Sequence, residues 1–156
     1  MQRGNTRMRS KFMIAMLIIL LGGNDYYLIC EEIGRQYDID PYLIMAIIDF
    51  ESNGNANAEN GSCKGLMQVS DYWHADRMER LGVTDIFDAR SNILVGTDYL
   101  AELIEKNGGN IGASLMEYNG DSNWDEYLRG ECEISNYARS VMKQADFWRF
   151  ETQEKE

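Results

Sequence analysis

Glu51 is the residue whose sequence surroundings most suggest chemistry. It follows Ile44, Ile47 and Ile48 at helical spacing, so a carboxyl group ends an apolar stripe. Burial beside apolar side chains and the carbonyl end of a helix both disfavour the carboxylate, and both raise its pKa. A carboxyl group that stays protonated near neutral pH can act as a general acid. From periodicity alone, the alternative is a glutamate at a helix end that turns to solvent.

The elements that would position Glu51 are helices. From residue 26 onward the apolar positions repeat at helical spacing and no stretch alternates like a strand, so the fold class is mainly α. Asn and Gly dominate residues 53–62, which predicts a loop. Helices are expected over 26–37, from Pro41 after the cap Asp40, over 71–79 after Ser70, over 89–106, over 111–119 after Asn110, and after Ser135.

Gly96 lies in the middle of the longest expected helix, 89–106. A glycine there costs about 1 kcal/mol relative to alanine. We therefore expect another element to approach this helix closely at Gly96.

Length and composition fit one domain. The chain has 156 residues with 44% hydrophobic content, a single proline and no repeat. The folded domain is expected over 24–150, followed by a charged tail over 151–156. The net charge is −11, and leaving out four basic residues near the N-terminus gives about −15 for the rest. Because phosphate binding needs a basic surface, a nucleic acid partner is not expected.

Residues 1–23 differ from the rest of the chain. Four basic residues precede a ten-residue apolar run at 12–21, in the order of a secretory signal peptide. That run is short for a membrane span, which needs about 20 residues. We expect a signal peptide, or an N-terminal membrane anchor if it is not cleaved. The alternative is an amphipathic first helix of the fold.

The three cysteines, Cys30, Cys63 and Cys132, and the only histidine, His74, show no metal-ligand spacing, so no zinc site is expected. In an exported protein two cysteines could pair. Cys63 with Cys132 is the favoured pair, because both fall in expected loops. Three free thiols are the alternative.

Five short motifs follow one another along the chain. They are Glu51-Ser52, then Gly65-Leu66-Met67-Gln68, then Asn92-Ile93 with Gly96 and Tyr99-Leu100, then Tyr118-Asn119, and then Glu133 with Tyr137. Together they resemble the lytic transglycosylase family, which is related to goose-type lysozymes. The resemblance covers residues 26 to about 148. The chain departs from the family pattern at Glu117, at Gly120-Asp121 and at Ile134.

The resemblance implies a lysozyme-like α-helical domain with a glycan-binding groove. It implies cleavage of the β-1,4 bond between N-acetylmuramic acid and N-acetylglucosamine in bacterial peptidoglycan, with 1,6-anhydromuramic acid ends as products. Glu51 would serve as the single acid and base, and the substrate's own groups would replace a second carboxylate. No metal or cofactor is implied. The protein would act as a monomer, secreted or anchored on the outer face of the cytoplasmic membrane.

Six residues are expected by resemblance to bind substrate, and Tyr118 is expected to orient the acid. For Ser52 a helix-end cap is the alternative role, and for Met67 and Tyr137 it is core packing. Trp73, His74 and Trp124 match no family role. The six expected residues are Ser52, Met67, Gln68, Tyr118, Asn119 and Tyr137.

Other functions remain as alternatives. A lysozyme-type muramidase would hydrolyse the same bond, with Asp121 or Glu59 positioning water. A non-catalytic module could bind glycan. A specialised enzyme could open the wall for a secretion, conjugation or phage machine, which would then be its partner.

Overall fold

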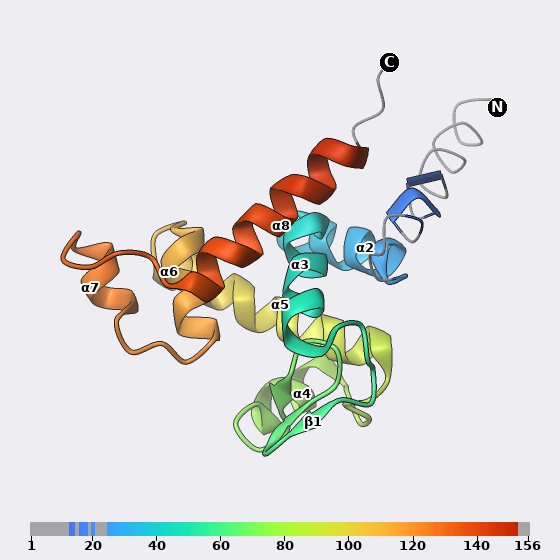
Figure 1. The fold of residues 1–156 in the computed structure, drawn as a ribbon. Coiled ribbons are helices and arrows are strands. Elements are labelled where there is room, and N and C mark those ends of the chain that lie inside the picture. The colour runs from blue at the N-terminus through green and yellow to red at the C-terminus, as the bar shows by residue number, and fades with distance from the viewer. Residues whose placement is uncertain (1–12, 15, 19, 21–24, 153–156) are drawn as a thin grey trace.

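The computed structural model describes residues 13–14, 16–18, 20 and 25–152. Helices dominate it, which confirms the expected mainly α class (Figure 1). In chain order the elements are α2 (Tyr27–Tyr37), α3 (Pro41–Ser52), β1 (Glu59–Asn60), β2 (Cys63–Lys64), β3 (Val69–Ser70), α4 (Ala75–Leu81), α5 (Ala89–Lys106), α6 (Ile111–Tyr118), α7 (Trp124–Leu128) and α8 (Asn136–Thr152).

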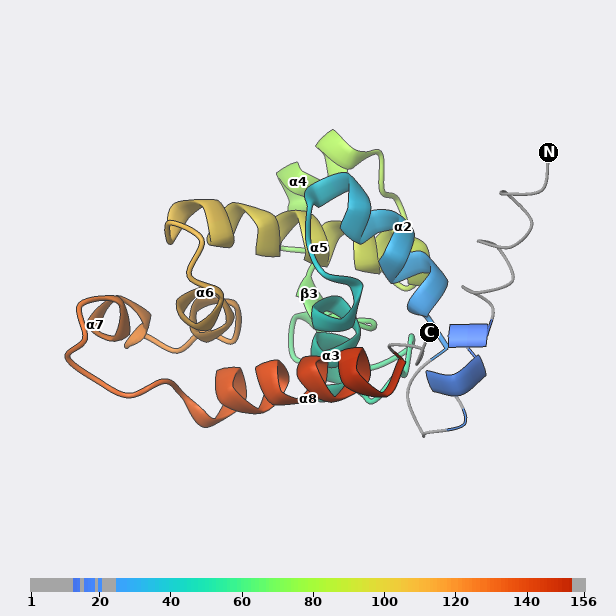
Figure 2. The ribbon, with the colours of Figure 1, turned by 90° about the horizontal axis from the view of Figure 1, so that it is seen from above.

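Helix α3 lies at the centre of the domain, between α2 and α8 (Figure 2). Every residue from Leu43 to Ile48 is buried, as expected of a helix that is apolar on all sides. Helix α8 crosses α3, and the indole Nε1 of Trp148 donates a 3.0 Å hydrogen bond to Asp49 Oδ2. The acid-bearing helix is therefore held along its length by the core.

Side-chain caps begin the helices where the sequence predicts. Asp40 accepts a hydrogen bond from the Tyr42 amide at 3.0 Å, and Pro41 starts α3. Asn110 caps α6, and the Ser135 hydroxyl accepts from the Ala138 amide at the start of α8. These caps satisfy amides that the first helical turn leaves without partners.

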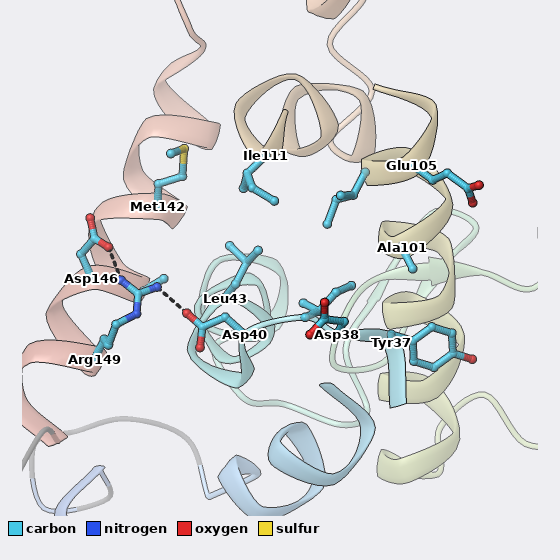
Figure 3. Close-up of a pocket in the computed structure, with 13 residues that line it drawn as sticks. Tyr37, Asp38, Asp40, Leu43, Ala101, Glu105, Ile111, Met142, Asp146 and Arg149 are labelled. Atoms are coloured by element: carbon cyan, nitrogen blue, oxygen red, sulfur yellow. Dashed lines mark hydrogen bonds and ion pairs between the residues drawn. The ribbon is translucent and has the colours of Figure 1, made fainter. Parts of the chain in front are cut away.

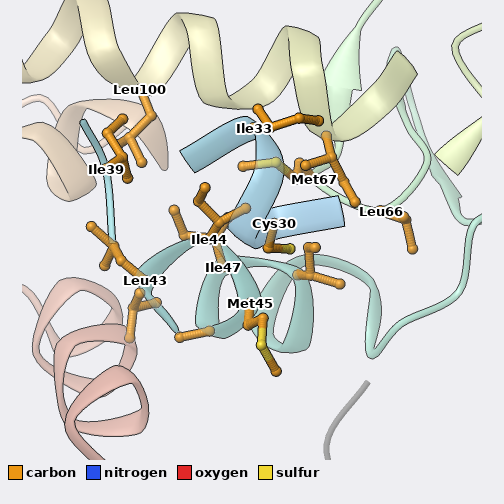
Figure 4. Packing of buried hydrophobic residues seen from close by; sticks show 14 of the residues in the cluster. Cys30, Ile33, Ile39, Leu43, Ile44, Met45, Ile47, Leu66, Met67 and Leu100 are labelled. Atoms are coloured by element: carbon orange, nitrogen blue, oxygen red, sulfur yellow. The ribbon is translucent and has the colours of Figure 1, made fainter. Parts of the chain in front are cut away.

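The core joins α2, α3 and α5 with the loop that follows β2 (Figure 4). Ile33 of α2, Ile44 of α3 and Leu100 of α5 are almost fully buried in it. Leu66 and Met67 from the loop are also fully buried. The loop next to Glu51 is thus anchored by its own apolar side chains.

The structure differs from expectation in three elements. The expected loop at 53–62 contains β1, which pairs antiparallel with β2, and β2 pairs with β3. Helix α4 begins at Ala75 instead of residue 71, because Ser70 belongs to β3 and its hydroxyl accepts from the Trp73 amide in a turn. Helix α7 was not expected. Strands of two residues and a helix of five are too short to show a period.

The cysteine pairing expected between Cys63 and Cys132 is wrong for this structure, in which all three cysteines are free. Cys63 lies on β2, whereas the Cys132 thiol lies beyond α7 and donates to the Asn123 carbonyl at 3.6 Å. Cys30 is fully buried in the core. The two cysteines that were expected to pair thus lie on different elements, and the sequence does not show how these elements are arranged.

The ends of the domain also differ from expectation. Helix α8 continues through 151–152, two residues expected in the charged tail, and Thr152 is buried, with its hydroxyl 2.6 Å from that of Tyr42. The described residues of the expected signal segment are helical, with Ile18 buried and Leu20 exposed. The basic residues before them lie outside the described part. Among the helices described, none has the length and apolar character needed to cross a membrane.

Candidate active site

Glu51 lies in the last turn of α3, partly buried, and faces the start of α8. The hydroxyl of Tyr137 donates a 2.5 Å hydrogen bond to Glu51 Oε1. Burial raises the pKa of Glu51, and the hydrogen bond from Tyr137 lowers it by less. The net effect is a raised pKa, which is the direction expected from the apolar stripe, and the partly buried carboxyl does not turn to solvent as the alternative had it.

Tyr137 is the partner that orients this carboxyl. Its own pKa is raised far above the usual value of a phenol, by burial and then by the charge of Glu51. It therefore stays protonated and acts only as a donor toward the carboxylate. The residue was expected to contact substrate or to pack in the core. It packs against the core, and its hydroxyl in addition holds the acid.

Tyr118 does not orient the acid, contrary to expectation. Its hydroxyl donates to the Met67 carbonyl at 2.8 Å. Burial is the main cause of its raised pKa, and the nearby charge of Glu51 adds to the effect. Tyr118 therefore lies near the acid and tethers the loop beside it.

The loop between β2 and β3, residues 65–68, is held by Asn92 of α5. Asn92 is fully buried; its Oδ1 accepts from the Met67 amide at 2.7 Å, and its Nδ2 donates to the carbonyls of Lys64 and Ile86 at 2.9 Å each. Gly65 leaves room for this amide, because a Cβ there would lie 2.2 Å from Asn92 Nδ2. Sequence reasoning matched Asn92 to a motif but gave it no role.

Gly96 is the second contact between α5 and this loop. A Cβ at Gly96 would lie 2.6 Å from the Met67 sulfur and 2.9 Å from its Cβ. The close approach expected at Gly96 is confirmed. Because the Met67 side chain is fully buried against α5, its core role holds, and only its carbonyl faces the site residue Tyr118.

Three more residues were expected to bind substrate, and their side chains differ in partners and exposure. Gln68 adopts a positive φ of 49°, and its side-chain amide donates to the carbonyls of Ala58 and Gly65. The Ser52 hydroxyl donates to the Ile48 carbonyl inside α3, and the residue that caps this helix is Asn53. Asn119 is exposed at the C-terminus of α6.

A groove of about 500 Å³ begins at Gln68 and Tyr118 and extends along α4 and α5. Trp73 is 76% exposed on its wall and meets the Tyr72 ring edge-on at 5.1 Å. Tyrosine and tryptophan are enriched at interfaces, where an apolar ring and a polar group can both be used. Glu51 is next to Tyr118 and not itself a lining residue. The lining residues are Cys63, Gln68, Val69, Ser70, Trp73, His74, Arg77, Tyr99, Glu102, Glu117, Tyr118 and Gly120.

Stacked aromatic rings and a paired arginine form the wall of the groove along α4 and α5. Tyr99 packs between His74, at a centroid distance of 4.5 Å, and Tyr118, at 5.3 Å. Arg77 lies over the Tyr99 ring and pairs with the buried carboxylate of Asp98. None of these wall contacts could be predicted, because each joins α4, α5 or α6 across the fold.

Neither carboxylate considered for positioning water accompanies Glu51. Glu59 is exposed on β1, and Asp121 accepts from the Asn123 amide in its own turn. Within residues 25–152 and the described part of the N-terminal segment, Tyr137 is the hydrogen-bond partner of the Glu51 carboxyl. The same part of the chain holds no cluster of residues suited to bind a metal ion. The arrangement provides one acid beside one donor, at the end of a groove.

Residues 29–134 match the family described as Transglycosylase SLT domain, which is most of the folded part. The chain belongs to the transglycosylase SLT domain family. Relatives of this SLT domain include a transglycosylase of Enterobacteria phage PRD1, 31% identical over 72% of this chain, and lysozyme g of Takifugu rubripes, 28% identical over 73%. The chain spans 41% and 62% of the lengths of these relatives.

The fold of the SLT domain is also that of a solved relative. An inactive mutant of the lytic transglycosylase Slt from Pseudomonas aeruginosa superposes with a TM-score of 0.67 over 80% of this chain and 24% of its own, at 17% identity. At that identity the likeness shows the fold alone. The expected lysozyme-like helical domain is confirmed.

Proposed function

We propose that this SLT domain is a peptidoglycan lytic transglycosylase in which Glu51 is the only acid and base. The observation that carries the proposal is the partly buried Glu51 carboxyl, with its raised pKa and its hydrogen bond from Tyr137. Membership of the transglycosylase SLT domain family supports the same reaction.

In the proposed reaction Glu51 gives its proton to the oxygen that links N-acetylmuramic acid to N-acetylglucosamine as the bond from C1 to that oxygen breaks. The 2-acetamido group of the substrate stabilises the cationic sugar. The carboxylate of Glu51 then takes the proton of the C6 hydroxyl, whose oxygen attacks C1. The product is a 1,6-anhydro sugar, and no water is consumed.

Tyr137 would assist most when Glu51 has lost its proton. A hydrogen bond to a charged acceptor is stronger than one to a neutral acceptor, so the 2.5 Å contact favours the ionised intermediate over the resting acid. Burial acts in the opposite direction and raises the pKa of Glu51, which favours the protonated acid. Burial and the hydrogen bond from Tyr137 together allow the Glu51 carboxyl to give a proton and to take one back.

The groove is proposed to hold the glycan strand next to Glu51. Gln68 and Tyr118 line its inner end, and Trp73 offers an exposed aromatic surface on its wall, with Tyr72 packed against it. Pyranose rings present apolar C–H faces that pack on such rings. Of the residues expected to bind substrate, Gln68 and Tyr118 are best placed to do so, whereas Ser52 and Met67 act by supporting the site.

The test is digestion of purified peptidoglycan by the chain, followed by mass spectrometry of the released muropeptides. Products that end in 1,6-anhydromuramic acid, one water lighter than hydrolysed ends and absent with Glu51→Gln, would support the proposal. Asp121→Asn is the matched control, because it also removes one carboxylate and should leave the products unchanged.

A lysozyme-type hydrolase is the second candidate, favoured by the similarity to lysozyme g. It predicts reducing ends that contain the added water. If no product depends on Glu51, a glycan-binding module would be the better account.

We also propose that residues 1–23 direct export, because basic residues precede a ten-residue apolar run. The chain would then act as a monomer at the outer face of the bacterial cytoplasmic membrane, as an anchored or a released protein. A secretion, conjugation or phage machine is the proposed setting, supported by the similarity to a phage transglycosylase. N-terminal sequencing of the exported protein would show whether the segment is cleaved.

A further inference from the structure

A second hollow, of about 640 Å³, lies away from the groove and shares no lining residue with it (Figure 3). It is framed by α5, α6 and α8 and by the segment that joins α2 to α3. We call it the α8 hollow. Its residue Asp40 and the acid Glu51 lie at opposite ends of α3, about 16 Å apart at the usual rise per residue. The α8 hollow is therefore separate from the proposed glycan site.

The floor of the α8 hollow is apolar. Ile39, Leu43 and Ala145 form it and are 8%, 6% and 2% exposed. Ile111 and Met142 stand at its walls, with Met142 37% exposed (Figure 3). A concave apolar surface of this volume is in the size range of pockets that bind ligands.

The rim of the α8 hollow is acidic. Asp38, Asp40, Glu105 and Asp146 supply four carboxylates, against the single guanidinium of Arg149. Arg149 is already paired, with Asp40 and with Asp146 at 2.5 Å (Figure 3). Across residues 25–152 and the described N-terminal positions, no cation pairs with Asp38 or Glu105. The rim thus carries an excess of three negative charges, and two of its carboxylates are available to a ligand.

We propose that the α8 hollow binds a cationic amphipathic peptide segment of a partner protein. One large apolar side chain of the segment would fill the floor, and lysine or arginine residues beside it would pair with Asp38 and Glu105. The two carboxylates lie on different elements, the segment after α2 and helix α5, so they suit two cations spaced along a peptide. Charge complementarity also disfavours an acidic partner or a nucleic acid.

The test is fluorescence anisotropy with a labelled peptide of about twelve residues that forms a helix with leucines on one face and lysines on the other. Titrations are made at about 150 mM salt, where general attraction to an acidic protein is screened. We expect saturable binding that is lost when the leucines of the peptide are changed to serine.

Two variants of the α8 hollow and one matched control decide where the peptide binds. Asp38→Asn with Glu105→Gln should weaken binding by at least about tenfold, and Ala101→Phe, which narrows the hollow, should do the same. Asp76→Asn with Glu79→Gln on α4 changes the net charge equally and should leave Kd unchanged. Circular dichroism, which should be unchanged, shows that each variant folds.

Three results would overturn the proposal. The first is equal binding to the native chain and to all variants, which would mean general charge attraction. The second is no saturable binding to the native chain. The third is that the chain itself occupies the α8 hollow. A second copy would give a concentration-dependent dimer, and the chain's own basic segment would give a gain in peptide binding on deletion of residues 1–12. Each result stands whether or not Glu51 cleaves glycan, since no substrate is present.

Discussion

Replacing Gly96 with alanine tests how finely the loop beside Glu51 must be placed. The added Cβ would lie 2.9 Å from the Cβ of Met67, so Met67 must move by about 0.5 Å to reach the 3.4 Å of ordinary contact. Its sulfur, at 2.6 Å, must move farther. The Met67 carbonyl accepts the hydrogen bond of Tyr118, and Gln68 follows it in the chain, so both groove residues shift with it.

The expected cost is small for stability and large for activity. Overpacking a core costs about 1–3 kcal/mol, and alanine returns about 1 kcal/mol of helix propensity. The free energy of unfolding should therefore fall by at most about 2 kcal/mol, which lowers Tm by less than about 8 °C. Because a misplacement of 1 Å can cost about a hundredfold in rate, kcat/KM should fall by about tenfold.

The assay pairs calorimetry with release of soluble muropeptides from purified peptidoglycan. Gly112→Ala is the matched control, because its Cβ would meet the side chains of Ile134 and Tyr127 at 3.0 Å, away from the loop. It should keep its kcat/KM. If Gly96→Ala lowers Tm while kcat/KM stays at the native value, placement of the loop does not govern the chemistry and the reasoning is refuted.

Four further variants test the site. Tyr137→Phe removes the hydrogen bond that lowers the pKa of Glu51, so the alkaline limb of the pH profile of kcat/KM should move to higher pH, and a move to lower pH would contradict this. At pH values above the pKa of Glu51, Glu51→Gln should raise Tm. The raised pKa of the folded state costs stability once the carboxyl ionises in the unfolded chain, so the gain should vanish at about pH 4. Trp73→Ala should raise KM for glycan oligomers by roughly two- to tenfold with kcat retained, and an unchanged KM would remove Trp73 from the glycan site. Asn92→Ala should lower the free energy of unfolding, measured by urea denaturation, by about 3 kcal/mol or more, because three buried backbone groups lose their hydrogen-bond partner.

The sequence predicted the long elements of the fold well. The apolar periods and the caps Asp40 and Asn110 located α3 and α6, and α5 has the bounds expected of it. Such signals are local, since each cap lies within a few residues of the amide it satisfies. The small sheet and α7 could not be predicted, because their pairing and packing depend on contacts from distant parts of the chain.

The site was only partly predictable for the same reason. The raised pKa of Glu51 followed from an apolar stripe that the sequence displays. Which tyrosine would orient the acid did not, because Tyr137 and Tyr118 both lie far from Glu51 in the chain and only the crossing of α8 over α3 selects Tyr137. The exposure of Trp73 likewise depends on how β3 turns into α4.

The fit between Gly65 and Asn92 restricts the order in which a descendant of this chain could change. Any side chain at residue 65 would strike the Asn92 amide, and the positive φ of 73° at Gly65 would strain it even if the amide were gone. Loss of Asn92 while Gly65 remains leaves the loop less firmly held but free of a clash. A change at residue 92 therefore loses hydrogen bonds without a clash, whereas a change at residue 65 made first adds a clash with Asn92 to the backbone strain.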